Sequence, residues 1–156
     1  MAKVKFASLG EHIGIASVRN VINYCMKEGR VLACNTFLPC AAEEFLAIQR
    51  YFGYDTTAET SIFHLVIAFS YEECFTSEKA IAMLPKIVGA IAFDHQIIAG
   101  VHSLTHSGRN NKHIHVAINP VGFRNGAVFP TDYRALGNIR KHAYDVLHEF
   151  RNYDCV

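Results

Sequence analysis

Two apolar segments joined by a short polar link constrain the fold of this chain more than any other feature. Residues 96–106 and 113–119 both read as strands, and the link 107–112 is polar and contains a glycine, as a hairpin loop does. A hairpin requires antiparallel pairing of its strands. Because further strand-like and helix-like segments alternate along the chain, we expect an α+β fold with a central, mostly antiparallel β-sheet.

The remaining elements follow from apolar periodicity and from helix start and stop residues. We expect Ser17 and Thr131 to cap helices, Gly29 and Gly53 to end them, and Pro85 to bend one. We expect the helices to pack on one face of the sheet. The expected elements are strand 4–9, helix 18–27, strand 31–37, helix 41–52, strand 61–69, helix 77–92, the hairpin, strand 127–129 and helix 133–151.

Length and composition exclude several classes of protein. The 156 residues are 51% hydrophobic, which excludes a disordered chain and predicts a single domain over residues 1–156. No apolar run approaches the length of a membrane span, and the N-terminus lacks the apolar core of a secretory signal. The five cysteines show no C-x2-C pair, which predicts reduced thiols in a cytosolic protein.

Histidines concentrate in the predicted hairpin. His113 and His115 flank Ile114, and alternate residues of a strand point to the same face. If the hairpin folds with His106 opposite His113, three imidazoles converge on one point, an arrangement that suits a divalent metal with open coordination positions. His102 has the same parity as His106 and is the alternative third ligand. Idle strand histidines are the other interpretation of this pattern, and we expect His64 to pack or hydrogen-bond locally.

Charge and helical periodicity add a phosphate site and a candidate nucleophile. The segment 101–141 carries six basic residues and one acidic residue, which is compatible with a phosphate-bearing ligand near the histidines. Ordinary surface charge is the alternative interpretation of these residues. In the helix 18–27, Tyr24 falls off the apolar stripe, so its hydroxyl is available. A phenol is a weak nucleophile unless a metal or a base assists it. A tyrosine that only packs at the edge of the core is the alternative.

These parts resemble a known family. Residues 105–119, T-H-S-G-R-N-N-K-H-I-H-V-A-I-N, resemble the third motif of relaxases, the mobilisation nucleases of the HUH endonuclease superfamily. Asn23 and Tyr24, followed by residues 28–35, resemble the first motif, which holds the catalytic tyrosine. The resemblance extends over about residues 18–145 and includes the segments 42–45, 64–70, 75–78 and 119–126.

The resemblance implies a function. A relaxase nicks one DNA strand at the transfer origin of a plasmid or another mobile element, through a 5′-phosphotyrosine intermediate. The resemblance implies Tyr24 as the nucleophile and His106, His113 and His115 as ligands of Mg2+ or Mn2+. It also implies single-stranded origin DNA as the partner, with accessory proteins of a relaxosome, in the bacterial cytoplasm. Arg109 and Lys112, in the loop between the ligands, are our own candidates for DNA phosphate contacts.

The chain departs from the family pattern at one position. Many relaxases carry an aspartate two residues after the first histidine of the third motif, where this chain has Gly108. Asp94 and Glu73 are candidate substitutes for that carboxylate.

Two other functions share parts of this pattern. A rolling-circle replication initiator has its tyrosine after the histidine pair, which points to Tyr133 or Tyr144. A non-catalytic module of the same fold would bind single-stranded DNA without forming a covalent product.

Overall fold

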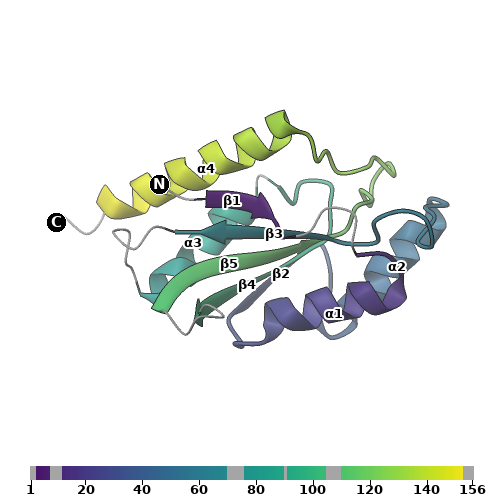
Figure 1. Cartoon of the computed structure of the whole chain (residues 1–156), viewed down its shortest axis with the longest axis horizontal. Helices are drawn as coiled ribbons and strands as arrows, with labels where there is room; N and C mark the ends of the chain where they lie inside the picture. Colours follow the sequence, from purple (N-terminus) through teal and green to yellow (C-terminus); the bar gives the residue numbers. More distant parts are fainter. Residues whose placement is uncertain (1–2, 8–11, 70–75, 90, 105–109, 153–156) are drawn as a thin grey trace.

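A five-stranded antiparallel sheet lies at the centre of the computed structural model, which describes residues 3–7, 12–69, 76–89, 91–104 and 110–152 (Figure 1). The strand order is β1-β3-β5-β4-β2, and every neighbouring pair is antiparallel. This confirms the α+β class. The strands are β1 (Lys3–Phe6), β2 (Val31–Cys34), β3 (Phe63–Ala68), β4 (Ile97–Leu104) and β5 (Asn110–Ile118). The helices are α1 (Ile15–Met26), the 3-10 turn η1 (Leu38–Cys40), α2 (Ala41–Tyr51), α3 (Ser77–Gly89) and α4 (Tyr133–Asn152).

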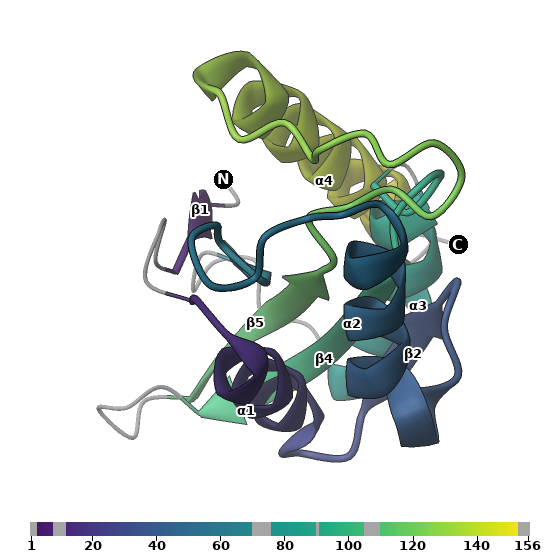
Figure 2. The ribbon, with the colours of Figure 1, turned by 90° about the vertical axis from the view of Figure 1, so that its right-hand side faces the viewer.

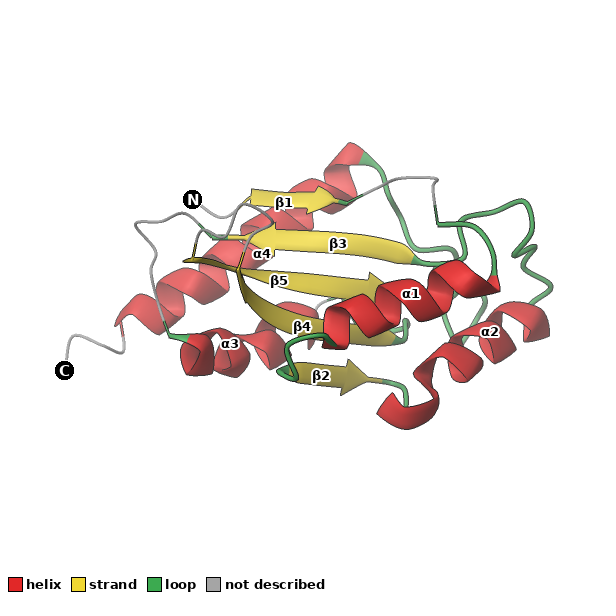
Figure 3. Ribbon diagram, turned by 60° about the horizontal axis from the view of Figure 1, so that its bottom comes forward, coloured by secondary structure: helices red, strands yellow, loops and turns green. Residues whose placement is uncertain are grey.

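Helices cover both faces of the sheet, which corrects the expectation that they lie on one. Ile97 and Val101 of β4 belong to a large core with α3 and α4. Ile98, on the opposite face of the same strand, belongs to a second core with α1 and α2. Figure 3 shows α1 in front of the strands and α4 behind them, and α1 and α2 pack against each other in Figure 2.

The covering of both faces explains the composition of the central strands. Every residue of β3 from Phe63 to Ile67 is buried. A strand with one face in water alternates apolar and polar residues, whereas a strand covered on both faces reads as a continuous apolar run. His102, His113 and His115 have the same parity as Ile98 and Ala117, so they lie on the face of the sheet that α1 partly covers.

Helix α1 begins three residues earlier than periodicity predicts. Gly14 precedes it with φ of 88°, a conformation that favours glycine. The Ser17 hydroxyl donates to the carbonyl of Ile13, so Ser17 lies inside the helix and is not its cap. The predicted apolar stripe is confirmed, because the buried residues of the helix are Val18, Val21, Ile22 and Cys25.

Three other local expectations differ from the structure. Helix α3 contains Pro85 as expected, but it ends at Gly89 and not at residue 92. The strand predicted at 127–129 is reduced to an isolated bridge between Val128 and Val121. The Asp132 carboxylate, rather than Thr131, accepts a backbone N–H in the first turn of α4.

Within the described ranges, no helix combines the length and the apolar character that crossing a membrane needs. The described cysteines, Cys25, Cys34 and Cys40, are free thiols. Burial raises the pKa of Cys25 to about 12, so its thiol stays protonated.

Candidate functional site

Three histidines from the two central strands converge on the face of the sheet that α1 partly covers. His102 of β4 lies directly opposite His113 of β5, and His115 follows on the same face. One ring nitrogen of each of these residues lies within 4.8 Å of the others. His102 and His115 are buried, and His113 is partly buried. The predicted convergence of three imidazoles from adjacent strands is therefore present, with His102 as the third member.

The register of the hairpin decides which histidine is the third. The predicted pairing of His106 with His113 is wrong, because His102 occupies that position. A bulge between His102 and Leu104 shifts the pairing, and Leu104 then faces Asn110. His106 and Arg109 lie outside the described residues, so their roles as a ligand and as a DNA contact stay predictions.

A backbone carbonyl fixes the orientation of His102. The ring Nε2 lies 3.2 Å from the carbonyl oxygen of Cys25, and a carbonyl only accepts, so Nε2 carries the proton. Burial lowers the pKa of His102, and the hydrogen bond to Cys25 opposes this shift. The neutral ring then has its lone pair on Nδ1, the nitrogen that can bind a metal.

His64 of β3 orients a second ligand. Its Nε2 lies 2.8 Å from Nδ1 of His115. Burial lowers the pKa of His64 to about 4, with smaller contributions from His12 and His102, so the ring is neutral and can accept. In the tautomer in which Nδ1 of His115 donates to His64, Nε2 of His115 carries no proton and can bind a metal. For His64 we predicted only local packing or hydrogen bonding, because parity within one strand does not identify the neighbours of a residue on the next strand.

The three histidines fit a divalent metal. Three neutral imidazoles leave the full charge of the ion to act on a ligand in the open positions. An all-nitrogen donor set suits first-row transition ions better than Mg2+, which prefers oxygen ligands. Of the two ions that the resemblance implies, the donor set favours Mn2+.

Tyr24 of α1 lies against this cluster. Its ring centroid is 4.9 Å from that of His115, 5.2 Å from that of His102 and 5.8 Å from that of His64. The helix comes this close because β4 has glycine at position 100. A Cβ on Gly100 would lie 1.8 Å from the carbonyl oxygen of Cys25, the residue after the tyrosine.

A cavity of about 880 Å³ opens over the cluster. Lys5 of β1 and Lys27, at the end of α1, bring positive charge to it. Lys112 precedes His113, so it points to the other face of the sheet, and its predicted DNA contact stays a prediction. The other residues that line the cavity are Ala7, His12, Asn20, Val21, Tyr24, Glu28, His64, Val66, Ala68, His102, His113 and His115.

Of the two carboxylates expected to support the site, Asp94 lies away from it in the described structure. Asp94 lies 3.2 Å from Nε of Arg124 and lines a different cavity, of about 450 Å³. Glu73 lies outside the described residues. Among the described residues, Glu28 is the acidic residue that lines the histidine cavity. In the sequence it stood out only as part of the segment 28–35, which resembles the first relaxase motif.

Comparison with protein families agrees with this geometry. The family model described as "Relaxase: MobA/VirD2-like, nuclease domain" matches residues 24–151, which is most of the chain and includes the tyrosine and all three clustered histidines. No curated protein sequence matches the chain. The extent of the family match shows that this chain belongs to the relaxase family, as a nuclease domain of the MobA/VirD2-like type.

Proposed function

We propose that this chain is a metal-dependent enzyme that nicks and transfers one DNA strand at the transfer origin of a mobile element. The observation that carries the proposal is the contact between Tyr24 and the histidine cluster. The phenol ring and the imidazoles come from different elements, yet their centroids lie 4.9 and 5.2 Å apart. A nucleophile beside a metal site is what phosphoryl transfer needs, since the chemistry depends on alignment and charge neutralisation.

In this mechanism Tyr24 is the nucleophile. Its oxygen forms a bond to the scissile phosphorus, and the bond between phosphorus and the 3′ oxygen breaks. The products are a 5′-phosphotyrosine and a free 3′-hydroxyl, and the phenol proton is transferred, in net terms, to the 3′ oxygen. A divalent ion bound by His102, His113 and His115 would supply Lewis-acid polarisation of a non-bridging phosphate oxygen.

The remaining parts of the chain would bind the substrate. Lys5 and Lys27 lie on the walls of the cavity, where a DNA backbone would pass. The partner is single-stranded DNA at the origin, with relaxosome accessory proteins, in the bacterial cytoplasm. We treat residues 1–156 as one nuclease domain, because the described segments share one sheet.

The geometry favours this proposal over a rolling-circle initiator. Tyr133 and Tyr144 lie on α4, which packs on the face of the sheet opposite the histidines. Tyr133 is 86% exposed, and the Tyr144 ring contacts His148 of its own helix. Neither contacts the cluster in the described structure, whereas Tyr24 contacts two of its three members.

A covalent adduct tests the proposal. Purified protein is incubated with Mn2+ and single-stranded oligonucleotides that tile the DNA flanking its gene, and the products are separated on a denaturing gel. We expect an adduct that survives denaturation. Tyr24→Phe should abolish it, because the ring remains but the attacking oxygen is gone.

The two tyrosines of α4 supply the matched controls. Tyr133→Phe and Tyr144→Phe should form the adduct at the wild-type level. Loss of the adduct in either of these variants, with Tyr24→Phe still active, would instead support the initiator. Binding of the oligonucleotides without any adduct would support the non-catalytic module.

A further inference from the structure

The six residues that follow the tyrosine hold β4 on both sides of His102. The carbonyl of Cys25 accepts a hydrogen bond from the His102 ring. The carbonyl of Arg30 accepts the backbone N–H of Val101, at 3.0 Å. One short segment, 25–30, therefore connects the helix of the nucleophile to the strand of a metal ligand.

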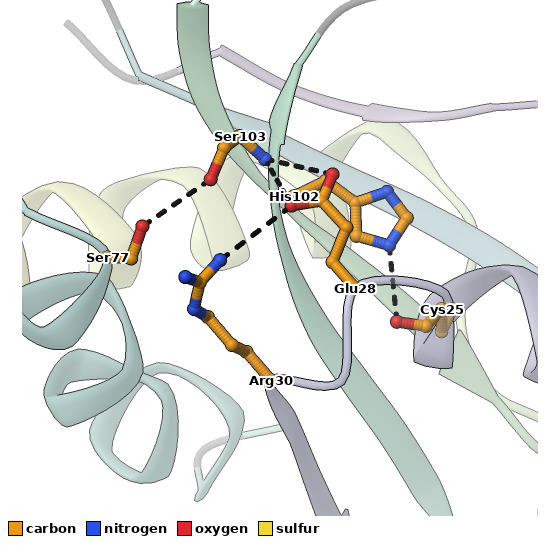
Figure 4. Close-up of polar contacts among 6 residues, drawn as sticks. All are labelled: Cys25, Glu28, Arg30, Ser77, His102 and Ser103. Carbon is orange, nitrogen blue, oxygen red and sulfur yellow. Dashed lines mark hydrogen bonds and ion pairs between the residues drawn. The ribbon is translucent and has the colours of Figure 1, made fainter.

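Glu28 makes the third connection between this segment and β4, beyond the point where β2 stops pairing with β4. Pairing of β2 with β4 ends at Val31 opposite Gly100, and the chain turns at Gly29 with φ of 73°. The backbone N–H of Ser103 therefore has no β2 carbonyl beside it. The Glu28 carboxylate accepts the hydrogen bond from this N–H instead, with its two oxygens 3.2 and 3.0 Å from the Ser103 nitrogen (Figure 4).

The carboxylate is itself held in place. Nη1 of Arg30 lies 3.8 Å from a Glu28 oxygen, and the Ser103 hydroxyl lies 3.4 Å from that of Ser77 in α3 (Figure 4). The Glu28 side chain is 27% exposed. Its anchor point is Ser103, which lies in the bulge between His102 and Leu104 and has no β2 residue opposite it, so this part of β4 has more freedom to shift.

We propose that Glu28 is a positioning residue, which holds His102 in register and thereby sets its place relative to Tyr24. The meaning of this placement rests on the proposed function, whereas the contacts themselves do not. Glu28 acts through the backbone at Ser103, which follows the ligand His102. It would supply, from the segment that follows the tyrosine helix, the acidic support that a glycine at position 108 does not give.

Measuring the metal affinity of Glu28 variants distinguishes the effect of the length of this side chain from the effect of its charge. Mn2+ binding to the whole chain is measured by calorimetry for the wild type and three variants. Glu28→Ala should weaken binding about 10- to 100-fold, the usual loss when the support of a ligand is removed. Glu28→Asp keeps the charge but loses the reach, so it should weaken binding similarly. Glu28→Gln keeps an oxygen that can accept from Ser103, and should bind within about threefold of the wild type.

Glu43→Ala is the matched control, since Glu43 also pairs with an arginine, Arg19, but lies at the surface away from the cavity. It should bind as the wild type does. Wild-type affinity in Glu28→Ala would overturn the proposal. Strong loss in Glu28→Gln with none in Glu28→Asp would also overturn it, because the charge would then be what matters.

A second readout needs no metal. Nitrogen-15 NMR of the imidazoles should show the His102 proton on Nε2 in the wild type and in Glu28→Gln, and a mixture of ring forms in Glu28→Asp. An unchanged His102 signal in Glu28→Asp would overturn the positioning role. If the wild type binds no Mn2+, the metal step of the proposed function fails, and the NMR comparison still decides the role of Glu28.

Discussion

The hydrogen bond between His64 and His115 makes a prediction at the scale of single residues. His64→Ala removes the hydrogen-bond partner of His115, and we expect about a tenfold or greater loss of Mn2+ affinity. Calorimetry measures the affinity, and circular dichroism confirms that the variant is folded. His148→Ala is the control, because His148 is exposed on α4, and it should bind Mn2+ normally. Equal affinity in the two variants would remove His64 from the site.

Strand parity predicted correctly that His113 and His115 are neighbours in space, and the resemblance to relaxases implied correctly that Tyr24 lies near them. The helical stripe placed Tyr24 at the edge of the core, and strand parity placed the two histidines on one face. The choice between His102 and His106 depended on the hairpin register, and the structure has His102 opposite His113. His102 and His106 have the same parity, and apolar periodicity gives the face of a residue but not the register of its strand, so the sequence could not decide between them.

Gly100 carries the prediction at the scale of elements, because α1 and β4 touch there through their backbones. Gly100→Ala would place a Cβ 1.8 Å from the carbonyl oxygen of Cys25, so the helix must move. We expect a loss of about 1–3 kcal/mol in the free energy of unfolding, measured in urea. We also expect weaker adduct formation, because Tyr24 moves with its helix.

Gly137→Ala is the matched control for that substitution. Gly137 lies inside α4, and a Cβ there meets no atom within 4 Å. Alanine is the better helix former, so this variant should gain about 0.5–1 kcal/mol. A neutral result for Gly100→Ala beside this gain would show that α1 does not need its close approach.

Most elements could be predicted from periodicity, but their distribution over the sheet could not. The alternation of segments gave the α+β class, and the order of helices and strands agrees with it. The continuous apolar run of β3 was the available sign that both faces are covered, since a half-exposed strand alternates. The start of α1 was missed because its N-cap residue is Gly14, which has a positive φ and no side chain that could cap the helix.

The charge around the cavity makes a prediction for the molecule as a whole. If a DNA strand crosses this face, Lys5→Ala and Lys27→Ala should each weaken binding to all single-stranded oligonucleotides alike. Each should also reduce the slope of log affinity against log salt by about 0.7, the value for one lost phosphate contact. Fluorescence anisotropy over a range of salt concentrations measures both effects.

Two further lysines complete that experiment. Lys141→Ala should leave the slope unchanged, because Lys141 is on α4 and pairs there with Asp145. Lys112→Ala tests the DNA contact predicted from the sequence. A reduced slope for Lys112→Ala, with none for Lys5→Ala and Lys27→Ala, would place the DNA along the hairpin loop instead of over the cavity.

The backbone contact at Gly100 also limits how the nucleophile can move. Helix and strand are in contact at Cys25, and the next residues are hydrogen-bonded to the strand, so neither element can slide past the other. The reach of the Tyr24 oxygen then depends on two side-chain torsion angles. A strand of DNA must therefore be brought to the tyrosine. Any opening or closing of the protein around α1 and β4 would change the access of the phosphate to the site, but not the orientation of the Tyr24 hydroxyl relative to the histidines.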